Sequence, residues 1–205
     1  MSSTQSVWKG VGKLTLTLAI VLGGGAVRAS AQPSPGEATP FMSEWVVIGG
    51  VGSSVGSGQR ANREQAFQAI EWGRLVSGEH GPGVLRGRLE MVLEITPVFL
   101  AFQSDRAQGV GFSPLMFRWN LREHGPIQPF LEMAGGVVAT NRDVPEGTTR
   151  MNFSSHAGAG VRVRVAERWG VVVGYRFHHL SNGSTAPRNP GITSNIGYLG
   201  LAYRR

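Results

Sequence analysis

The chain has 205 residues, which fits one domain, and it carries a formal net charge of +7. It contains no cysteine, which excludes a disulfide framework and thiolate chemistry. A hydrophobic fraction of 41% is ordinary for a soluble protein and equally ordinary for a membrane barrel with a polar interior, so composition does not separate these two classes.

The N-terminus has the pattern of a secretory signal peptide. Lys9 and Lys13 precede an apolar run over residues 14–27, and Ala29-Ser30-Ala31 is a small-x-small cleavage site. A retained membrane anchor is the weaker alternative, because the run is short for a span and contains three glycines. The predicted organisation is a cleaved signal peptide at 1–31, a flexible lead-in at 32–43 and one domain at 44–205.

Removal of the signal peptide changes the charge balance. Lys9, Lys13 and Arg28 leave with it, so 17 arginines remain against 13 acidic residues, a net charge of +4. These arginines are spread singly along the chain instead of forming a basic stripe, which argues against a nucleic-acid partner.

The mature chain contains a succession of segments in which apolar and polar residues alternate with a period of two, and turn-forming residues separate them. It has no convincing amphipathic helix, so the pattern predicts an all-β fold. The eight segments are Glu44–Val51, Ala66–Val76, Val84–Ile95, Gly109–Leu121, Ile127–Ala139, Met151–Ala166, Trp169–Leu180 and Ser194–Tyr203.

The two faces of the third segment differ in chemistry. Leu89 and Leu93 lie on one side, whereas Arg86, Glu90 and Glu94 lie on the other. In a soluble sandwich or lipocalin-like barrel the charged face would meet water, while in an outer-membrane barrel it would pair inside and the apolar face would meet lipid. Segment length, charged faces of mixed sign, and Trp and Tyr near segment ends favour an eight-stranded antiparallel transmembrane β-barrel in the outer membrane of a Gram-negative-type bacterium.

The lengths of the connections predict an orientation. Those after the even-numbered segments, such as Gly78–Gly83, are shorter than those after the odd-numbered ones, such as Thr96–Gln108. Outer-membrane barrels have short periplasmic turns and longer external loops. With the N-terminus in the periplasm, the seventh strand runs outward, and it carries His179 and Ser181 to the outer-leaflet end on the lipid-facing side.

These two residues have the chemistry of an esterase. His179 and Ser181 share one face of a strand, about 7 Å apart along the chain. An imidazole that accepts the proton of a hydroxyl is a general solution for acyl transfer. Nearby, Asn189 offers an amide donor, and Gly183 lets a backbone N–H group approach a developing oxyanion. A lipid-facing position suits an ester whose acyl chain already lies in the membrane.

The stretch Tyr175–Asn182, followed by Asn189-Pro190-Gly191-Ile192, resembles the outer-membrane lipid A 3-O-deacylases, eight-stranded barrels related to PagL. The resemblance covers most of the mature chain. Its other motifs are Gly83–Glu90, Gly111–Pro114, Gln128–Glu132 and Asn152-Phe153.

The resemblance implies that Ser181 is the nucleophile, that His179 is the base and that Asn189 contributes to the oxyanion hole. The family removes the ester-linked acyl chain at position 3 of lipid A without a metal or nucleotide. It therefore implies lipid A or lipopolysaccharide as substrate, outer-membrane lipid as surroundings and no cofactor. The sequence makes no prediction of the oligomeric state.

The sequence departs from the family at one residue of the catalytic triad of nucleophile, base and acid: the acid. The family's acid is a glutamate, and counting from His179 puts it at Thr193. No Asp or Glu follows Glu167 in the chain. Either Thr193 or Asn195 orients the imidazole instead, or an acid arrives from another strand, or the protein is a non-catalytic structural or adhesive barrel of the same shape.

Overall fold

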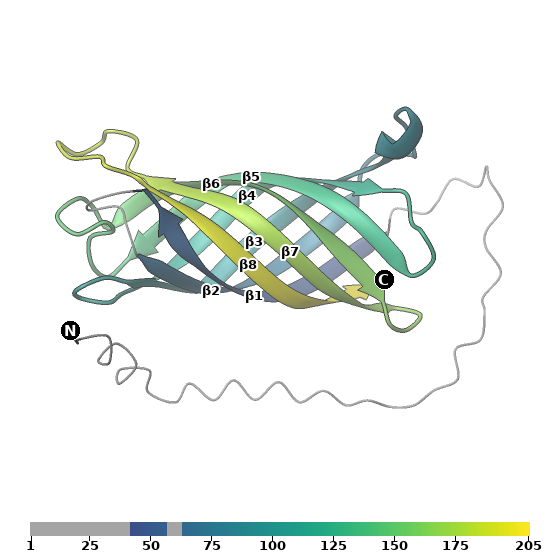
Figure 1. The fold of residues 1–205 in the computed structure, drawn as a ribbon, viewed down its shortest axis with the longest axis horizontal. Coiled ribbons are helices and arrows are strands. Elements are labelled where there is room, and N and C mark those ends of the chain that lie inside the picture. The colour runs from purple at the N-terminus through teal and green to yellow at the C-terminus, as the bar shows by residue number, and fades with distance from the viewer. Residues whose placement is uncertain (1–41, 57–62) are drawn as a thin grey trace, which may run out of the picture. The chain divides into compact units, whose positions relative to one another are not determined.

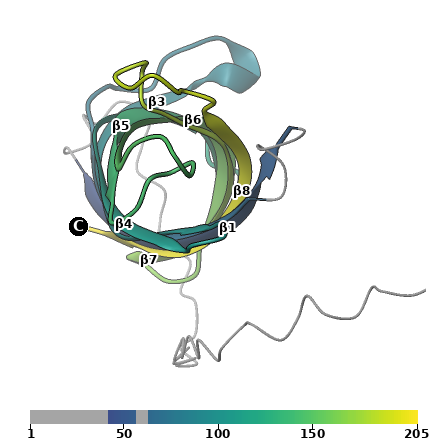
Figure 2. The same ribbon diagram turned by 90° about the vertical axis from the view of Figure 1, so that its left-hand side faces the viewer.

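The computed structural model describes residues 42–56 and 63–205, and these residues form a closed antiparallel barrel (Figures 1 and 2). Each strand pairs with its neighbours in sequence, and β1 closes the barrel against β8, which confirms the predicted fold class. The predicted signal peptide and nearly all of the lead-in lie outside the described residues. The strands are β1 (Ser43–Val55), β2 (Glu64–Leu75), β3 (Gly87–Phe102), β4 (Ala107–Leu121), β5 (Ile127–Thr140), β6 (Met151–Arg164), β7 (Trp169–Ser181) and β8 (Ile192–Arg204).

Side chains along the strands alternate between the lumen and the outer wall. In β7, Arg176, His178 and Leu180 are buried in the lumen, whereas Tyr175 and Phe177 are exposed on the wall. The closed ladder pairs the backbone polar groups of every strand, so the wall itself can be apolar. This is the alternation of a membrane barrel, with charges inside and hydrocarbon side chains outside.

A network of buried ion pairs fills the middle of the lumen. Arg176 donates to Glu132 at 2.7 Å, to Glu94 at 2.7 Å and to Glu71 at 2.8 Å. Arg118 donates to Glu71 at 2.7 Å and to Glu132 at 3.0 Å, so two carboxylates are shared between the two guanidinium groups. Because a buried charge without a partner is costly, this interlocked set explains why the inward faces carry both signs.

Four aromatic side chains form a row around one end of the outer wall. Strand register places Trp72 opposite Trp45, Trp45 opposite Tyr203, and Tyr203 opposite Trp169. The rings of Trp169 and Tyr203 lie 5.0 Å apart. Trp and Tyr concentrate at the membrane–water interface, so the row marks one boundary of the bilayer.

The beginning of the third predicted strand is wrong. Residues 83–85 form a 3-10 turn, η3 (Gly83–Leu85), and β3 begins only at Gly87. Pro82 and Gly83, the latter with φ of +50°, favour a turn over an extended segment. Arg86 therefore lies outside the lumen and pairs with Glu79 at 3.5 Å. No helix in the described part of the chain has both the length and the hydrophobicity to span a membrane.

Two predicted connections also differ in length. β3 continues to Phe102 instead of ending at Ile95, so only residues 103–106 join it to β4. The strand passes Pro97 at a register irregularity between Thr96 and Phe99, where a proline costs no ladder hydrogen bond. Conversely, the β2–β3 connection is longer than predicted because it includes η3.

The β5–β6 connection closes one mouth of the lumen. Figure 2 shows this loop folding into the barrel, and Val144 within it is completely buried. Val144 belongs to an apolar cluster at one end of the barrel. At this end, called the loop end, β1 is joined to β2, β3 to β4, β5 to β6 and β7 to β8. The other buried members of this cluster are Phe99, Ala101, Ala107, Val138, Leu180 and Ile192.

Candidate active site

His179 and Ser181 lie on the outer wall, at the loop end of β7, which is on the left of Figure 1. His179 is exposed, whereas its neighbours His178 and Leu180 are buried in the lumen. The alternation of a strand therefore separates the two adjacent histidines onto opposite sides of the barrel wall. Only His179 shares a face with Ser181.

Residues of β6, β8 and the β7–β8 loop lie next to His179. Its Nδ1 atom forms a 2.9 Å hydrogen bond with Thr193 Oγ1 on β8. On the other side, Ser155 of β6 occupies the position opposite His179 in the strand register. Gly191 lies over the ring, because a Cβ added there would be 3.0 Å from His179 Cε1. Gly191 also has a φ of +63°, so a larger residue would be strained as well as crowded.

Ser181 is the last residue of β7 and is partly buried. Within residues 42–56 and 63–205, no hydrogen bond joins its hydroxyl to His179. Catalytic hydrogen bonds are often long without substrate, and the shared face keeps the two groups on the same side. Phe153 lies opposite Ser181 in the register and is exposed on the wall, so apolar surface adjoins the hydroxyl.

The β7–β8 loop is built around Asn182. This side chain is buried, donates to Arg188 O at 2.8 Å and accepts from the Ser184 N–H group at 2.9 Å. The backbone N–H of Asn182 in turn donates to Asn189 Oδ1 at 3.1 Å. Because a backbone donor must meet an oxygen, this contact fixes the orientation of the Asn189 amide and leaves its NH₂ group available.

Gly183 follows Asn182 and has a φ of +59°. A Cβ added at this position would be 2.9 Å from the ring of Phe153. A side chain would therefore collide with the wall beside Ser181, and the left-handed backbone would also strain it. Glycine here lets the backbone turn closely over the end of β7.

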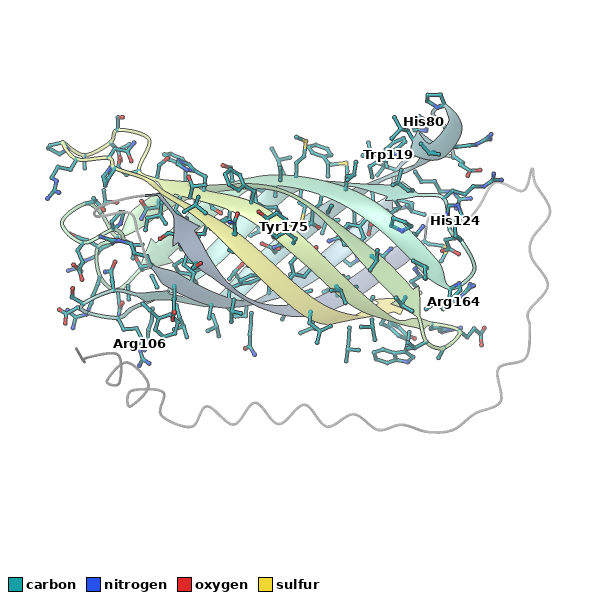
Figure 3. The ribbon with its side chains drawn as sticks, in the orientation of Figure 1. His80, Arg106, Trp119, His124, Arg164 and Tyr175 are labelled. Carbon is teal, nitrogen blue, oxygen red and sulfur yellow. The ribbon has the colours of Figure 1, made fainter. Side chains whose placement is uncertain are left out.

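The structure separates the two residues that sequence reasoning offered as orienters of the imidazole. Thr193 contacts His179, but Asn195 does not: it lies one position further along the wall, opposite Phe177, and its Oδ1 accepts from the hydroxyl of Tyr175 at 2.5 Å. Figure 3 labels Tyr175 on the wall. The Tyr175–Asn195 pair and Ser155 were not found from sequence, because the register that brings neighbouring strands together is not visible in one strand's pattern.

No ion pair joins His179 to a carboxylate anywhere in the described ranges of the chain. Those ranges also contain no cluster of three or more His, Asp or Glu side chains arranged to hold a metal ion. In the described part of the chain, the hydrogen-bond partner of His179 Nδ1 is thus the neutral hydroxyl of Thr193.

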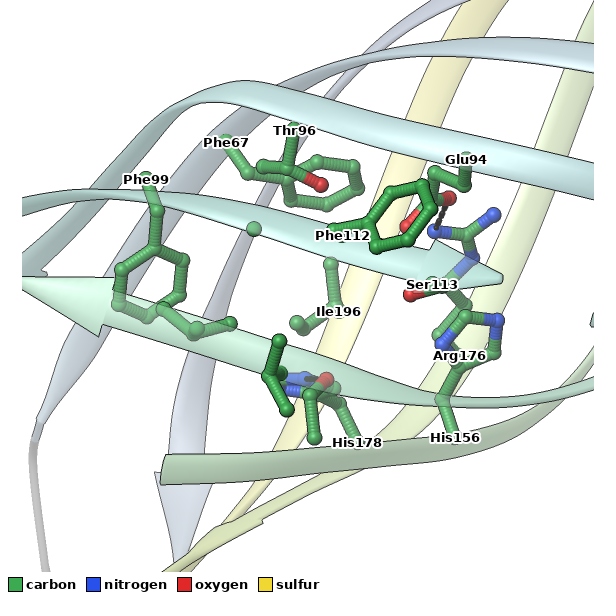
Figure 4. Close-up of a pocket in the computed structure, with 14 residues that line it drawn as sticks. Phe67, Glu94, Thr96, Phe99, Phe112, Ser113, His156, Arg176, His178 and Ile196 are labelled. Atoms are coloured by element: carbon green, nitrogen blue, oxygen red, sulfur yellow. Dashed lines mark hydrogen bonds and ion pairs between the residues drawn. The ribbon is translucent and has the colours of Figure 1, made fainter. Parts of the chain in front are cut away.

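A serine–histidine contact lies inside the barrel. His178 Nε2 is 2.8 Å from Ser154 Oγ, and both residues line a cavity of about 30 Å³ together with His156, Glu94 and Arg176 (Figure 4). This volume suits one or two water molecules. The buried Nδ1 atom of His178 has no protein partner in the described residues, which water in the cavity would supply. The wall separates this cavity from His179 and Ser181.

The fold and the lipid-facing polar site define an outer-membrane β-barrel of Gram-negative type. The model of the family "Lipid A 3-O-deacylase (PagL)" matches residues 57–202, and the chain belongs to this family. No curated protein matches the sequence.

Solved structures show the same barrel. The crystal structure of the outer membrane enzyme PagL is 22% identical, covers 76% of this chain and 97% of its own, and has a TM-score of 0.61. The attachment invasion locus protein Ail of Yersinia pestis, in complex with the heparin analogue sucrose octasulfate, is 9% identical, covers 80% and 99%, and has a TM-score of 0.51. At these identities the likeness concerns the fold.

Proposed function

We propose that this protein is a lipid A 3-O-deacylase, a serine esterase that hydrolyses the ester-linked acyl chain at position 3 of lipid A. Membership of a lipid A deacylase family supports the reaction class. The observation that carries the proposal is the hydrogen bond between His179 and Thr193 on the lipid-facing wall, beside Ser181. A polar group on such a wall is costly without a role, and here it is an imidazole held in one orientation.

The depth of the site supports a membrane substrate. β7 advances ten residues from Trp169, in the aromatic row, to His179. That is about 33 Å along the strand and, at a tilt of about 40°, about 25 Å along the barrel axis. The apolar band of outer-membrane barrels is also about 25 Å tall. His179 therefore lies near the opposite boundary of the bilayer, where the acyl esters of a glycolipid meet its sugar.

In the proposed reaction, Ser181 Oγ attacks the carbonyl carbon of the ester and His179 Nε2 accepts the hydroxyl proton. The tetrahedral intermediate collapses, the bond to the sugar oxygen breaks, and the protonated imidazole returns the proton to that oxygen. Water then attacks the acyl-serine with His179 again as base. The products are a free fatty acid, a sugar hydroxyl and regenerated enzyme.

Thr193 acts in this mechanism as the orienter of the base. For Nε2 to accept a proton, Nδ1 must carry one, and the Nδ1–H group then donates to Thr193 Oγ1. A hydroxyl fixes the tautomer and the ring orientation. It stabilises the imidazolium less than a carboxylate does, so we expect a slow enzyme.

The developing oxyanion is stabilised by two groups of the β7–β8 loop. The NH₂ group of Asn189 is one, since its Oδ1 is already engaged by Asn182. The backbone N–H of Gly183 is the other. No metal or cofactor takes part in these steps, and the proposed substrate is lipid A within lipopolysaccharide.

The alternative is a non-catalytic structural or adhesive barrel. The neutral partner of Nδ1 and the missing hydrogen bond between Ser181 and His179 in the described residues favour it. The decisive experiment is mass spectrometry of lipid A from cells with and without the protein. The proposal expects a product lighter by one ester-linked acyl chain, with unchanged amide-linked chains. Identical lipid A in both strains, with the folded barrel present in the outer membrane, would establish the alternative.

A further inference from the structure

The β2–β3 connection stands away from the barrel and carries apolar side chains that remain exposed. Figures 1 and 2 show it projecting beyond the outline of the barrel, at the end opposite the loop end. The predicted orientation puts this end in the periplasm. Within η3, Val84 is 90% exposed and Leu85 is 55% exposed. Turns in water normally carry polar residues, so two adjacent exposed apolar side chains point to a partner.

Backbone hydrogen bonds within the turn hold it in shape. His80 and Gly87 exchange two of them, each 2.9 Å long, and the N–H group of Arg86 donates to Gly83 O at 3.2 Å. Because these bonds fix the backbone in the free protein, a partner does not have to order a loop on binding. The exposed pair is therefore part of a preformed surface.

The turn is attached to the lipid-facing side of the wall. The indole N–H of Trp119 donates to Leu85 O at 3.0 Å, and the ring of His80 packs edge-on against Trp119 with the centroids 4.7 Å apart (Figure 3). Trp119 lies on the outward face of β4, because the neighbouring Arg118 and Asn120 are buried in the lumen. An outward tryptophan near a strand end is typical of the membrane–water interface. The turn therefore continues the lipid-facing surface at the boundary of the bilayer.

Positive charge lies beside this apolar surface. The backbone N–H of Arg122 donates to Arg86 O at 3.0 Å, which places the two arginines next to each other. Both pair with the single carboxylate of Glu79, at 3.7 and 3.5 Å, so one positive charge is in excess. The arginine side chains are at least half exposed, which leaves their guanidinium donors accessible to a phosphate. Apolar residues beside arginines are typical of elements that lie in a membrane interface.

We infer that the β2–β3 turn docks on the anionic phospholipid surface of the periplasmic leaflet. Val84 and Leu85 enter the layer between headgroups and acyl chains, while Arg86 and Arg122 bind headgroup phosphates. Each arginine near an anionic surface favours the docked turn by about fivefold. The contact holds the barrel at a defined depth, at the end away from His179. It does not depend on the proposed deacylase function.

The experiment places a nitroxide label at Val84→Cys in the folded full-length barrel, which has no other cysteine. The protein is reconstituted in phosphatidylcholine vesicles with and without phosphatidylglycerol, and the collision rates of the label with oxygen and with a water-soluble nickel chelate are measured. We expect phosphatidylglycerol to shift the label toward oxygen and away from the chelate. A label at His124→Cys, exposed in the neighbouring β4–β5 connection, is the control and should stay accessible to the chelate in both kinds of vesicle (Figure 3).

Substitution of the two arginines tests the charge. Arg86→Gln combined with Arg122→Gln should abolish the response of the Val84 label to phosphatidylglycerol, because the donors that bind phosphate are lost. Arg142→Gln is the matched control. It removes an exposed arginine, paired with Asp105, at the opposite end of the barrel, and should leave the response unchanged.

Substitution of Leu85 tests the apolar contact. Leu85→Ser removes the apolar side chain but keeps the backbone oxygen that is bonded to Trp119, and should move the label toward water. Heat-modifiable gel mobility reports folding for each variant.

Three results would overturn the inference in different ways. A Val84 label that is equally open to the nickel chelate in both kinds of vesicle would show that the turn stays in water. Shielding from both reagents would identify a second copy of the chain, the only protein in the vesicles, as the partner. Equal burial with and without phosphatidylglycerol would remove the role of the arginines.

Discussion

At the residue scale, the proposal depends on one imidazole and one hydroxyl. Ser181→Ala and His179→Asn should each reduce acyl release by about three orders of magnitude or more, because removing one member of a nucleophile–base pair costs nearly as much as removing both. Ser155→Ala is the matched control: it deletes the hydroxyl of the serine that pairs with His179 in the β6–β7 register and that the mechanism does not use. Loss of activity in Ser155→Ala with retention in Ser181→Ala would reassign the nucleophile.

Substitutions at Thr193 test whether a neutral hydroxyl orients the imidazole of His179. Thr193→Glu should raise the deacylation rate by about tenfold or more, since a carboxylate stabilises the imidazolium that forms in the transition state. Thr193→Val keeps the shape but removes the hydroxyl bonded to Nδ1, and should lower the rate by about tenfold. Rates are compared on purified lipid A at equal folded fraction. A glutamate variant slower than the wild type would mean that a different group orients His179.

At the element scale, the strands depend on the ionic network in the lumen. Arg176→Met leaves three buried carboxylates without one of their cations, and should lower the free energy of unfolding by about 3–5 kcal/mol. Arg142→Met breaks an exposed pair with Asp105 and should cost no more than about 1 kcal/mol. Urea unfolding in detergent micelles, followed by tryptophan fluorescence, measures both. Equal stability of the two variants would contradict the structural role of the network.

The elements also show how far sequence reasoning reaches. Period-two alternation predicted β7 closely, because every residue from Val171 to Ser181 follows the in–out pattern of a wall between lumen and lipid. The same rule failed at Val84–Arg86, where a local Pro-Gly turn outweighed the alternation, and at Pro97, where an irregular register carries the strand past a residue that normally ends one. Within the site, the outward His179–Ser181 face was predictable from β7 alone. The contact of Asn195 with Tyr175 required the β7–β8 register, which local patterns do not specify.

At the scale of the whole molecule, we expect the apolar outer wall to face the lipid of the bilayer. The chain has no cysteine, so one introduced cysteine carries a nitroxide label without competition. Labels at Ile95 and Leu199, both exposed on the wall, should be accessible to oxygen and shielded from a water-soluble nickel chelate in liposomes. A label at Arg106, in the β3–β4 connection, should show the reverse and serves as the control. Water exposure at Ile95 or Leu199 would contradict the membrane barrel.

The filled lumen determines the route by which substrate would reach the proposed active site. Ion pairs occupy the middle of the barrel and Val144 closes its mouth, so neither substrate nor product travels through the protein. Under the proposed function, substrate therefore reaches His179 laterally, within the plane of the leaflet. The encounter rate then depends on the mole fraction of substrate among its neighbouring lipids, and diluting the lipid with detergent slows turnover even at constant total concentration. In the proposed reaction, the released fatty acid would stay in the same layer and compete for the same wall until it diffuses away.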